Sequence, residues 1–207
     1  MEEVKTTRQE LLRLKKYLVQ VKNAKKLLEE KRDTLVEEFL KLKREFVQKK
    51  KELFEKTREV ISLVEFSIKY NPISTIDFIS SKPKANFELE STTFLTMGVK
   101  SKMFKVKNFE FEEIDKEICP KSFLDAILKF KEIFPQFIEL ASLENTLNKL
   151  ANAIKRTRRR VNYLKEIVIP NLEQKVKYLT QRLSDQEREN FVFNLKFKSK
   201  ILTKTFF

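Results

Sequence analysis

The sequence has almost no glycine: Gly98 is the only one in 207 residues. Glycine serves tight turns and places where the backbone approaches a ligand closely. Its near absence therefore indicates a chain built mainly from long regular elements with few turns. It also excludes a Gly-rich phosphate-binding loop of the Walker type, because one glycine is too few to form it.

Histidine is absent, and Cys119 is the single cysteine. Without histidine the chain lacks most zinc sites, the usual general base and every nucleophile system that pairs serine or cysteine with histidine. One cysteine forms no internal disulfide, which fits a reducing compartment. Composition leaves a carboxylate-only or lysine-based enzyme open, but catalytic carboxylates need a desolvated cleft. We expect no catalytic residue, no metal and no cofactor.

Long apolar runs are also missing. No run approaches the ~18 residues of a transmembrane helix, and the charged segment Met1–Lys5 lacks the apolar stretch of a signal peptide. We expect no direct membrane insertion. Basic residues are abundant instead: 44 Lys and Arg against 30 Asp and Glu give a net charge of +14. Such a charge favours a nucleic acid, an anionic membrane or an acidic protein surface.

A heptad repeat dominates the first third of the chain. Apolar residues fill twelve of the sixteen seam positions between Leu11 and Leu63, a pattern typical of a coiled coil. The helix is predicted to begin at a capping box, Thr7 to Glu10, and to end before Asn71-Pro72. At ~1.5 Å per residue it would be about 90 Å long. The remaining seam positions are basic and should weaken the pair while fixing its alignment; they are Lys25, Arg32, Lys49 and Lys56.

A second apolar stripe extends from Leu143 to Leu183 and predicts a helix over about 135–200. Its spacing changes to fours between Leu164 and Val176, around Pro170, so we expect an irregularity there. Because each stripe is the nearest partner for the other, the chain is predicted to be mainly α. Residues 1–71 and 135–207 would form a long antiparallel two-helix coiled coil, with Leu11 opposite 183–194 and Leu63 opposite Leu143. Parallel homodimers through each stripe are the alternative.

The middle, residues 72–134, differs in period. Alternating residues at 87–90, 103–106 and 109–111 predict short strands forming a hairpin, and Ser122–Phe134 predicts a short amphipathic helix. The lone Gly98 indicates a bulge or close backbone contact. We interpret this segment as a small strand-plus-helix head inserted between the long helices.

Charge clusters give the candidate contact residues. Lys155–Arg160 is the strongest, and Lys41–Arg44 with Lys49–Lys51 is the second. The antiparallel alignment predicts that they form one basic belt. The belt would be a solvated surface, a phosphate-binding surface or a docking surface for an acidic collar. The apolar tip, Ile201 to Phe207, would be a frayed end or would insert into a hydrophobic sleeve.

Several motifs together resemble the D subunit of V-type and archaeal A-type ATPases, and they span nearly the whole chain. They are Leu27-Leu28 with Lys31-Arg32-Asp33 and Leu35, then Thr96-Met97-Gly98-Val99, then Thr157 to Leu164 with Ile169-Pro170, and then Asp185 with Glu187-Arg188-Glu189, Leu195-Lys196 and Lys198. The contact candidates are Arg156, Arg158, Arg159, Arg160, Lys31, Arg32, Asp33, Glu187, Arg188, Glu189, Met97, Gly98, Phe206 and Phe207.

The resemblance implies a central rotor shaft without catalysis of its own. Its partners would be the catalytic A and regulatory B subunits of the ring, the small central-stalk F subunit near the head, and the funnel-shaped C (d) subunit that joins the membrane rotor. The chain would lie on the cytoplasmic side of the membrane as a peripheral part of a complex that couples ATP synthesis or hydrolysis to proton or sodium transport. The alternative from another class is a free coiled-coil scaffold or nucleic-acid-binding rod.

Overall fold

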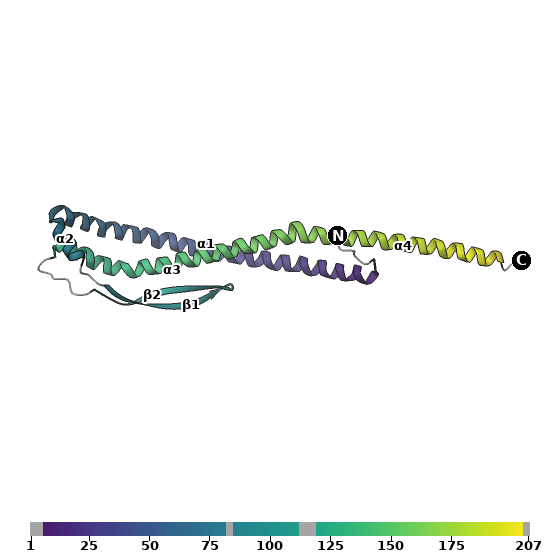
Figure 1. Cartoon of the computed structure of the whole chain (residues 1–207), viewed down its shortest axis with the longest axis horizontal. Helices are drawn as coiled ribbons and strands as arrows, with labels where there is room; N and C mark the ends of the chain where they lie inside the picture. Colours follow the sequence, from purple (N-terminus) through teal and green to yellow (C-terminus); the bar gives the residue numbers. More distant parts are fainter. Residues whose placement is uncertain (1–5, 82–84, 112–118, 205–207) are drawn as a thin grey trace. The chain divides into compact units, whose positions relative to one another are not determined.

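The computed structural model describes residues 6–81, 85–111 and 119–204. Three long helical segments and one hairpin make up most of it (Figure 1). The chain divides into two compact units, one of residues 1–32 with 156–207 and one of residues 33–155. The elements in chain order are α1 (Arg8–Tyr70), α2 (Ile73–Ser80), β1 (Ala85–Thr96), β2 (Val99–Phe111), α3 (Lys121–Tyr163), η1 (Leu164–Val168) and α4 (Ile169–Lys204).

The ends of α1 confirm the sequence prediction. The Thr7 hydroxyl accepts the backbone N–H of Glu10 at 3.2 Å, and the Thr7 carbonyl accepts that of Leu11. This side-chain cap satisfies one of the donors that a helix start leaves without an intrahelical partner. The helix continues for 63 residues to Tyr70, and Asn71-Pro72 follows its end as expected.

In the first unit, the N-terminal part of α1 pairs antiparallel with α4. One ion pair joins Arg8 to Glu187 at 2.7 Å, and another joins Lys22 to Glu173 at 2.7 Å. A later residue of α1 thus pairs with an earlier residue of α4, which shows that the two helices are antiparallel. The seam is apolar and buried, as the heptads predicted. Its most buried members include Val21, Val161, Leu172 and Leu179.

The predicted irregularity near Pro170 is confirmed and is a π-helical turn. Residues Leu164–Val168 form η1, and the N–H of Ile169 donates to the carbonyl of Leu164, five residues earlier. Such a turn carries one residue more than an α-turn. This accounts for the change to a spacing of four along the apolar stripe. Pro170 follows directly and has no N–H to donate to the helix.

The second unit pairs the rest of α1 with α3, and here one boundary was predicted wrongly. The second long helix begins at Lys121 rather than about 135, so Ser122–Phe134 is its first part and no separate helix. Pro135 lies inside α3 and is exposed. The backbone carbonyl that it leaves without a donor can therefore bind water.

This earlier start shifts the alignment of the two helices. The hydroxyls of Ser67 and Ser122 lie 2.6 Å apart. One turn away from them, Leu63 and Ala126 belong to the same apolar cluster. Leu63 therefore does not face Leu143, as was expected. The ion pair between Lys129 and Glu59, at 3.2 Å, confirms that α1 and α3 are antiparallel. The buried centre of the cluster is Leu53, Val60, Ala126 and Ile133.

The hairpin β1–β2 is antiparallel, as predicted, but its turn is tighter than expected. Met97 and Gly98 are the two residues of the loop, with φ of 50° and 83°. Positive φ at both positions is the requirement of a type I′ turn. Gly98 therefore forms the turn and not a bulge. The bulge lies at the other end, where Asn86 and Glu88 flank the register shift and Asn108 has φ of 50°.

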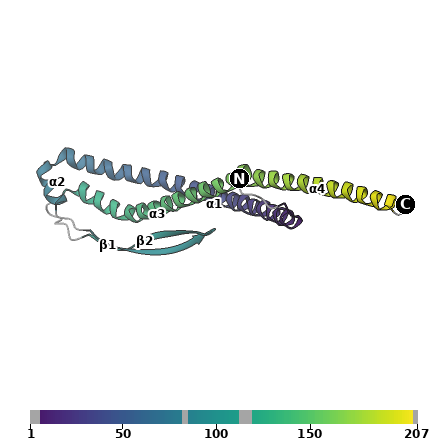
Figure 2. The ribbon, with the colours of Figure 1, turned by 45° about the vertical axis from the view of Figure 1, so that its right-hand side comes forward.

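The hairpin lies beside α3 in both views of the ribbon (Figure 2). The backbone N–H of Phe104 donates to the Ser142 hydroxyl at 3.0 Å. The ring of Phe109 stacks on that of Phe134, with centroids 4.5 Å apart and an interplanar angle of 11°. Strand pairing alone gives a two-stranded hairpin only marginal stability in water. The contacts with α3 therefore stabilise the hairpin.

Candidate interaction surfaces

The arginine cluster lies on the outside of α3. Arg156, Arg158, Arg159 and Arg160 are all exposed, whereas Thr157 between them is buried. The helical period causes this pattern, because Thr157 occupies the seam between Ile154 and Val161. Three consecutive arginines on a helix project over about 200° of its circumference. They therefore form a broad positive surface and not a pocket for a single anion.

Within the second unit, Lys49–Lys51 lies away from Lys155. Lys49 contacts Glu139 of α3, which lies sixteen residues, or about 24 Å of helix, before Lys155. These two segments were expected together because the second helix was taken to start later, with Leu63 opposite Leu143; the belt as a whole stays a prediction. Lys49–Lys51 therefore belongs to a different stretch of the second unit from Lys155.

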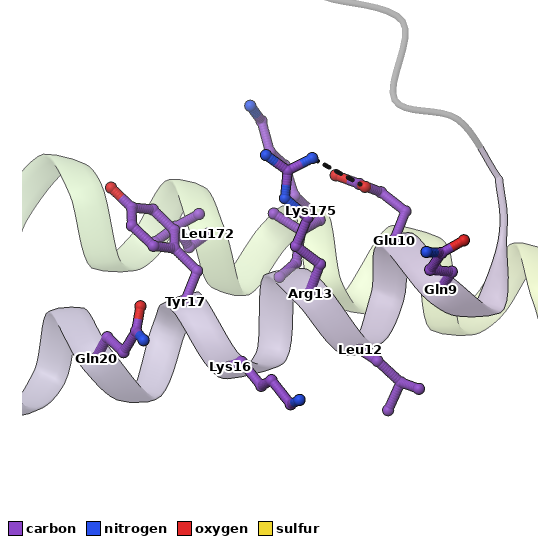
Figure 3. A pocket seen from close by; sticks show the side chains of 10 residues that line it. Gln9, Glu10, Leu12, Arg13, Lys16, Tyr17, Gln20, Leu172 and Lys175 are labelled. Atoms are coloured by element: carbon purple, nitrogen blue, oxygen red, sulfur yellow. Dashed lines mark ion pairs between the residues drawn. The ribbon is translucent and has the colours of Figure 1, made fainter.

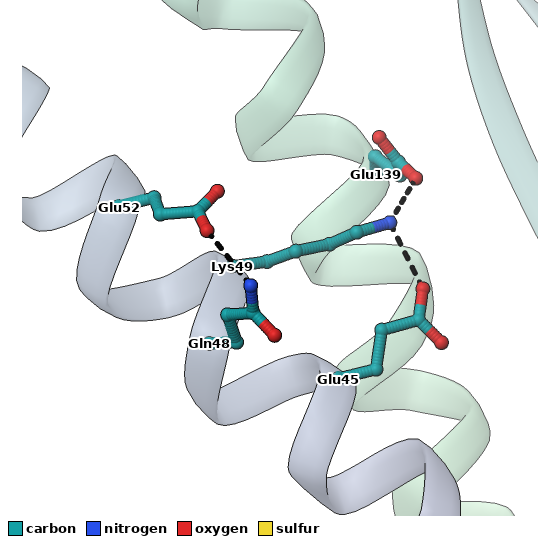
Figure 4. Close-up of polar contacts among 5 residues, drawn as sticks. All are labelled: Glu45, Gln48, Lys49, Glu52 and Glu139. Atoms are coloured by element: carbon teal, nitrogen blue, oxygen red, sulfur yellow. Dashed lines mark hydrogen bonds and ion pairs between the residues drawn. The ribbon is translucent and has the colours of Figure 1, made fainter.

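Lys49 shows how a basic residue fits into the seam. Its ammonium lies 2.6 Å from Glu139 across the pair and 3.0 Å from Glu45 on its own helix (Figure 4). The hydrogen bond to Glu139, followed by that to Glu45, raises the pKa of Lys49. Lys56 donates similarly to the Gln136 amide oxygen at 3.1 Å. Both lysines thus tie a seam position to one particular position of α3, as a register-fixing residue would.

The other charged candidates lie along the helices. Lys31 and Asp33 are exposed and Arg32 is half-buried; none of the three is without an interaction partner. Glu187 pairs with Arg8 across the helix pair. The flanking candidates Arg188 and Glu189 are exposed on α4.

The remaining candidates are apolar or lie in the hairpin. Met97 and Gly98 form the hairpin tip, where the Met97 side chain is exposed. Phe206 and Phe207 lie outside the described residues. Within the second unit, Asp33 lies on α1, whereas Met97 and Gly98 lie in the hairpin.

The grooves of the first unit are open and lie along the helix surface. One, of about 930 Å³, lies between the start of α1 and α4. In it Tyr17 and Arg13 point toward α4, and Arg13 pairs with Glu10 at 3.6 Å (Figure 3). No group of three or more His, Cys, Asp or Glu side chains among the described residues is arranged to hold a metal ion. Within the same ranges, no helix is long and apolar enough to cross a membrane.

Sequence reasoning missed the acceptors of the seam lysines and the helix α2. Glu139 and Gln136 are unremarkable in the sequence, and only the alignment of the two helices shows that they face Lys49 and Lys56. The eight residues of α2 carry a weak signal: Pro72 stands at the N-cap, and Ile76 and Ile79 are buried. A proline before an apolar i, i+3 pair could have indicated a short helix.

Comparison with known proteins identifies one family. The profile of the family described as the D subunit of ATP synthase matches residues 10–199. The D subunit of the A-type ATP synthase of Thermococcus kodakarensis is 36% identical over 197 residues, covering 93% of this chain and 92% of that protein. That of Pyrococcus abyssi is 37% identical over 197 residues, with the same coverage. The D subunit of the V-type ATP synthase of Acetivibrio thermocellus is 35% identical over 208 residues, covering 96% of this chain and 92% of its own length.

These matches extend over both compact units and include every motif on which the resemblance was based. None of the three relatives is named as a free scaffold or a nucleic-acid-binding protein, so that alternative has no support. The chain belongs to the D-subunit family of ATP synthases.

Proposed function

We propose that this D subunit is the central-stalk rotor of a rotary ATPase. It transmits torque between a nucleotide-hydrolysing ring and a membrane rotor, and so couples ATP synthesis or hydrolysis to proton or sodium transport. Its partners are the catalytic A and regulatory B subunits of the ring, the small central-stalk F subunit, and the funnel-shaped C (d) subunit. The chain contributes no catalytic residue and lies peripherally on the cytoplasmic side of the membrane.

The observation that carries this proposal is the exposed aromatic end of α4. Helix α1 begins at Arg8, opposite Glu187, so α1 does not extend alongside the later residues of α4. In the described part of that later stretch, up to residue 198, five large apolar side chains are about half exposed or more. They are Phe191, Val192, Phe193, Leu195 and Phe197. An exposed cluster of this kind marks a surface for a partner.

The distribution of apolar side chains around this segment is the one expected for the end of a shaft. Its apolar side chains project to several sides of one helix, and Phe193 stacks on Phe197 at 6.3 Å. A helix that is apolar all round is typical of a fully surrounded position. A sleeve that encloses the helix would bury these side chains, and the apolar tip that ends in Phe206 and Phe207 would continue the same surface.

The exposed arginines form the second proposed contact with the ring. Arg158, Arg159 and Arg160 face outward from α3, so they are available to an acidic collar. Spread over much of the helix circumference, they would meet successive faces of such a collar during rotation. Electrostatic contacts of exposed groups are individually weak. Weak contacts would permit rotation where tight ion pairs would oppose it.

Reconstitution with the A, B and F subunits tests the proposal. The full chain should enter an A–B ring, and the Phe191→Ser, Phe193→Ser and Phe197→Ser triple variant should bind the ring at least tenfold more weakly. Tyr178→Ser, which removes an exposed ring from the same helix within its paired part, is the matched control. Failure of the unaltered chain to join a ring would refute the rotor role.

The arginines are tested separately, by single-molecule torque. The Arg158→Gln, Arg159→Gln and Arg160→Gln variant should lower ring affinity or ATP-driven torque, with Lys15→Gln and Lys16→Gln as the control for lost surface charge. If torque and affinity were unchanged in the arginine variant, the proposed collar contact would be wrong, although the rotor role could still hold.

A further inference from the structure

The outer edge of the hairpin is a long strand that is paired on one side. Among the described residues, the sheet consists of β1 and β2, and no further strand lies beside β1. The residues from Ala85 to Thr93 are all exposed, and Leu95 is exposed by 65%. The edge of such a strand presents a row of backbone N–H and C=O groups that need hydrogen-bond partners.

The two edges of the hairpin differ in what covers them. The amide of Phe104 in β2 donates to the Ser142 hydroxyl of α3 at 3.0 Å, so the edge of β2 faces α3. In an antiparallel pair, residues whose N–H groups point inward alternate with residues whose N–H groups point outward. Phe104 is paired with Ser91, so the amide of Ser91 also points outward, on the other edge. The same alternation gives outward backbone groups at Leu89, Thr93 and Leu95.

The edge of β1 lacks the features that usually keep a strand edge from pairing. Native proteins protect such edges with lysine, proline, bulges or short strands. Between Glu88 and Thr96 there is no lysine and no proline, and the pairing with β2 has no register shift over this stretch. The lysines of the hairpin lie instead in β2, whose edge faces α3. They are Lys100, Lys102, Lys105 and Lys107.

We propose that an extended segment of another protein subunit adds a strand to the outer edge of β1. Backbone hydrogen bonds would hold the segment, and the neighbouring side chains would select it. Glu88 and Glu90 are exposed, and Glu90 also pairs with Lys107 at 3.1 Å. The added strand would therefore carry Lys or Arg beside Glu88, and apolar residues beside Leu89 and Leu95. The inference rests on the proposed function only in taking this segment to belong to a subunit of the same complex.

Charge favours this occupant over a second copy of the chain and over an anionic membrane. A second β1 would bring its own two glutamates and no cation to the contact, and like charges on neighbouring strands are destabilising. An anionic membrane surface would be repelled by the same carboxylates. It also lacks the alternating donors and acceptors that would pair with the edge.

Hydrogen exchange tests the pairing. In the chain alone the outward amides of Ser91 and Thr93 should exchange freely, and in the assembled complex their exchange should slow at least tenfold. The amide of Phe104, which donates to Ser142 in the chain alone, is the matched control and should change less than about threefold. Unchanged exchange at Ser91 and Thr93 would overturn the proposal. Slowing that appears in the concentrated chain alone would also overturn it, because it would indicate a second copy.

Photo-crosslinking in the assembled complex identifies the occupant. Leu95→benzoylphenylalanine places the probe on the edge of β1, and Leu128→benzoylphenylalanine is the control, at a position of α3 that is 54% exposed. Position 95 should crosslink to a segment of another subunit that carries Lys or Arg. Crosslinks to lipid, to a second copy or to a segment without basic residues would overturn the proposal, as would equal capture of the same segment from position 128.

Two substitutions at one position separate backbone pairing from side-chain contact. Thr93→Pro removes an outward N–H, and proline is tolerated on an edge strand where that group faces solvent. It should weaken binding to the crosslinked subunit at least fivefold, whereas Thr93→Val keeps the N–H and should stay within about twofold. Equal affinities would refute the proposal. So would loss of exchange protection at the inward amides of Thr92 and Phe94 in Thr93→Pro, because the Thr93 amide would then belong to the hairpin. Entry of the unaltered chain into the A–B ring tests the rotor role independently.

Discussion

Replacement of Leu150 by alanine gives the most direct test of the helix pair. Leu150 of α3 has 0% of its side chain exposed, among the most buried in the chain. Deletion of three buried carbons from a leucine removes transfer free energy and leaves a cavity, and it costs about 2–5 kcal/mol in packed cores. A narrow pair collapses more readily than a globular core, so we expect about 3 kcal/mol. For a chain of this length that lowers the melting temperature by about 6–12 °C.

The matched control is Leu128→Ala in the same helix, where 54% of the side chain is exposed. It should change the free energy of unfolding by less than about 0.5 kcal/mol. Urea denaturation and thermal melting of the full chain, both followed by circular dichroism at 222 nm, would give the two values. Equal losses for Leu150→Ala and Leu128→Ala would refute the seam assignment, because the buried position would then have no special contact.

Three further predictions concern polar and backbone features. The pKa of Lys49 is raised, so its pairing stabilises the fold fully below pH ~10.5, and this stabilisation is lost as the pH rises through the folded-state pKa. Between pH 10 and 12 the unaltered chain should therefore lose more stability than Lys49→Met in urea titrations. The difference should be less than about 1 kcal/mol, because the pair is exposed. Gly98→Ala should cost about 1–2 kcal/mol because φ there is 83°, whereas Gly98→Asn should cost less, as measured by denaturant midpoint. Ser142→Ala removes the acceptor of the Phe104 N–H and should speed hydrogen exchange at that amide about tenfold; unchanged exchange would show that the hydroxyl does not hold the hairpin.

The sequence predicted the helical elements well, because their signals are local and repeated. The period of seven fixes which residues of α1 are buried, and Thr7 and Pro72 fix where it begins and ends. The start of α3 was misplaced because Pro135 was taken as a boundary. Proline is tolerated in a helix where the carbonyl it leaves unpaired faces water. Whether that carbonyl faces water depends on what packs against the helix, and the local sequence pattern does not show this.

The contact surfaces were harder to predict, since they depend on how the helices are aligned. A shift of α3 along α1, relative to the expected alignment, separated Lys49–Lys51 from Lys155 and brought Glu139 to Lys49. A stripe of exposed apolar residues at intervals of seven could have been found from its spacing alone; it consists of Leu40, Val47, Phe54, Ile61 and Ile68. It was missed because every heptad was assigned to a single partner helix.

The shared period of seven has a mechanical consequence for this stripe. An α-helix has 3.6 residues per turn, so a line of residues seven apart drifts by about 20° per heptad around a straight helix. Supercoiling with α3 removes this drift for the seam, and it removes it equally for any other line with the same period. The stripe therefore keeps a constant angle to the seam along its length. Lys49 and Lys56, which tie α1 to particular residues of α3, hold the alignment on which that constancy depends. A change that releases them should therefore alter the angle between the stripe and the seam, although neither lysine belongs to the stripe.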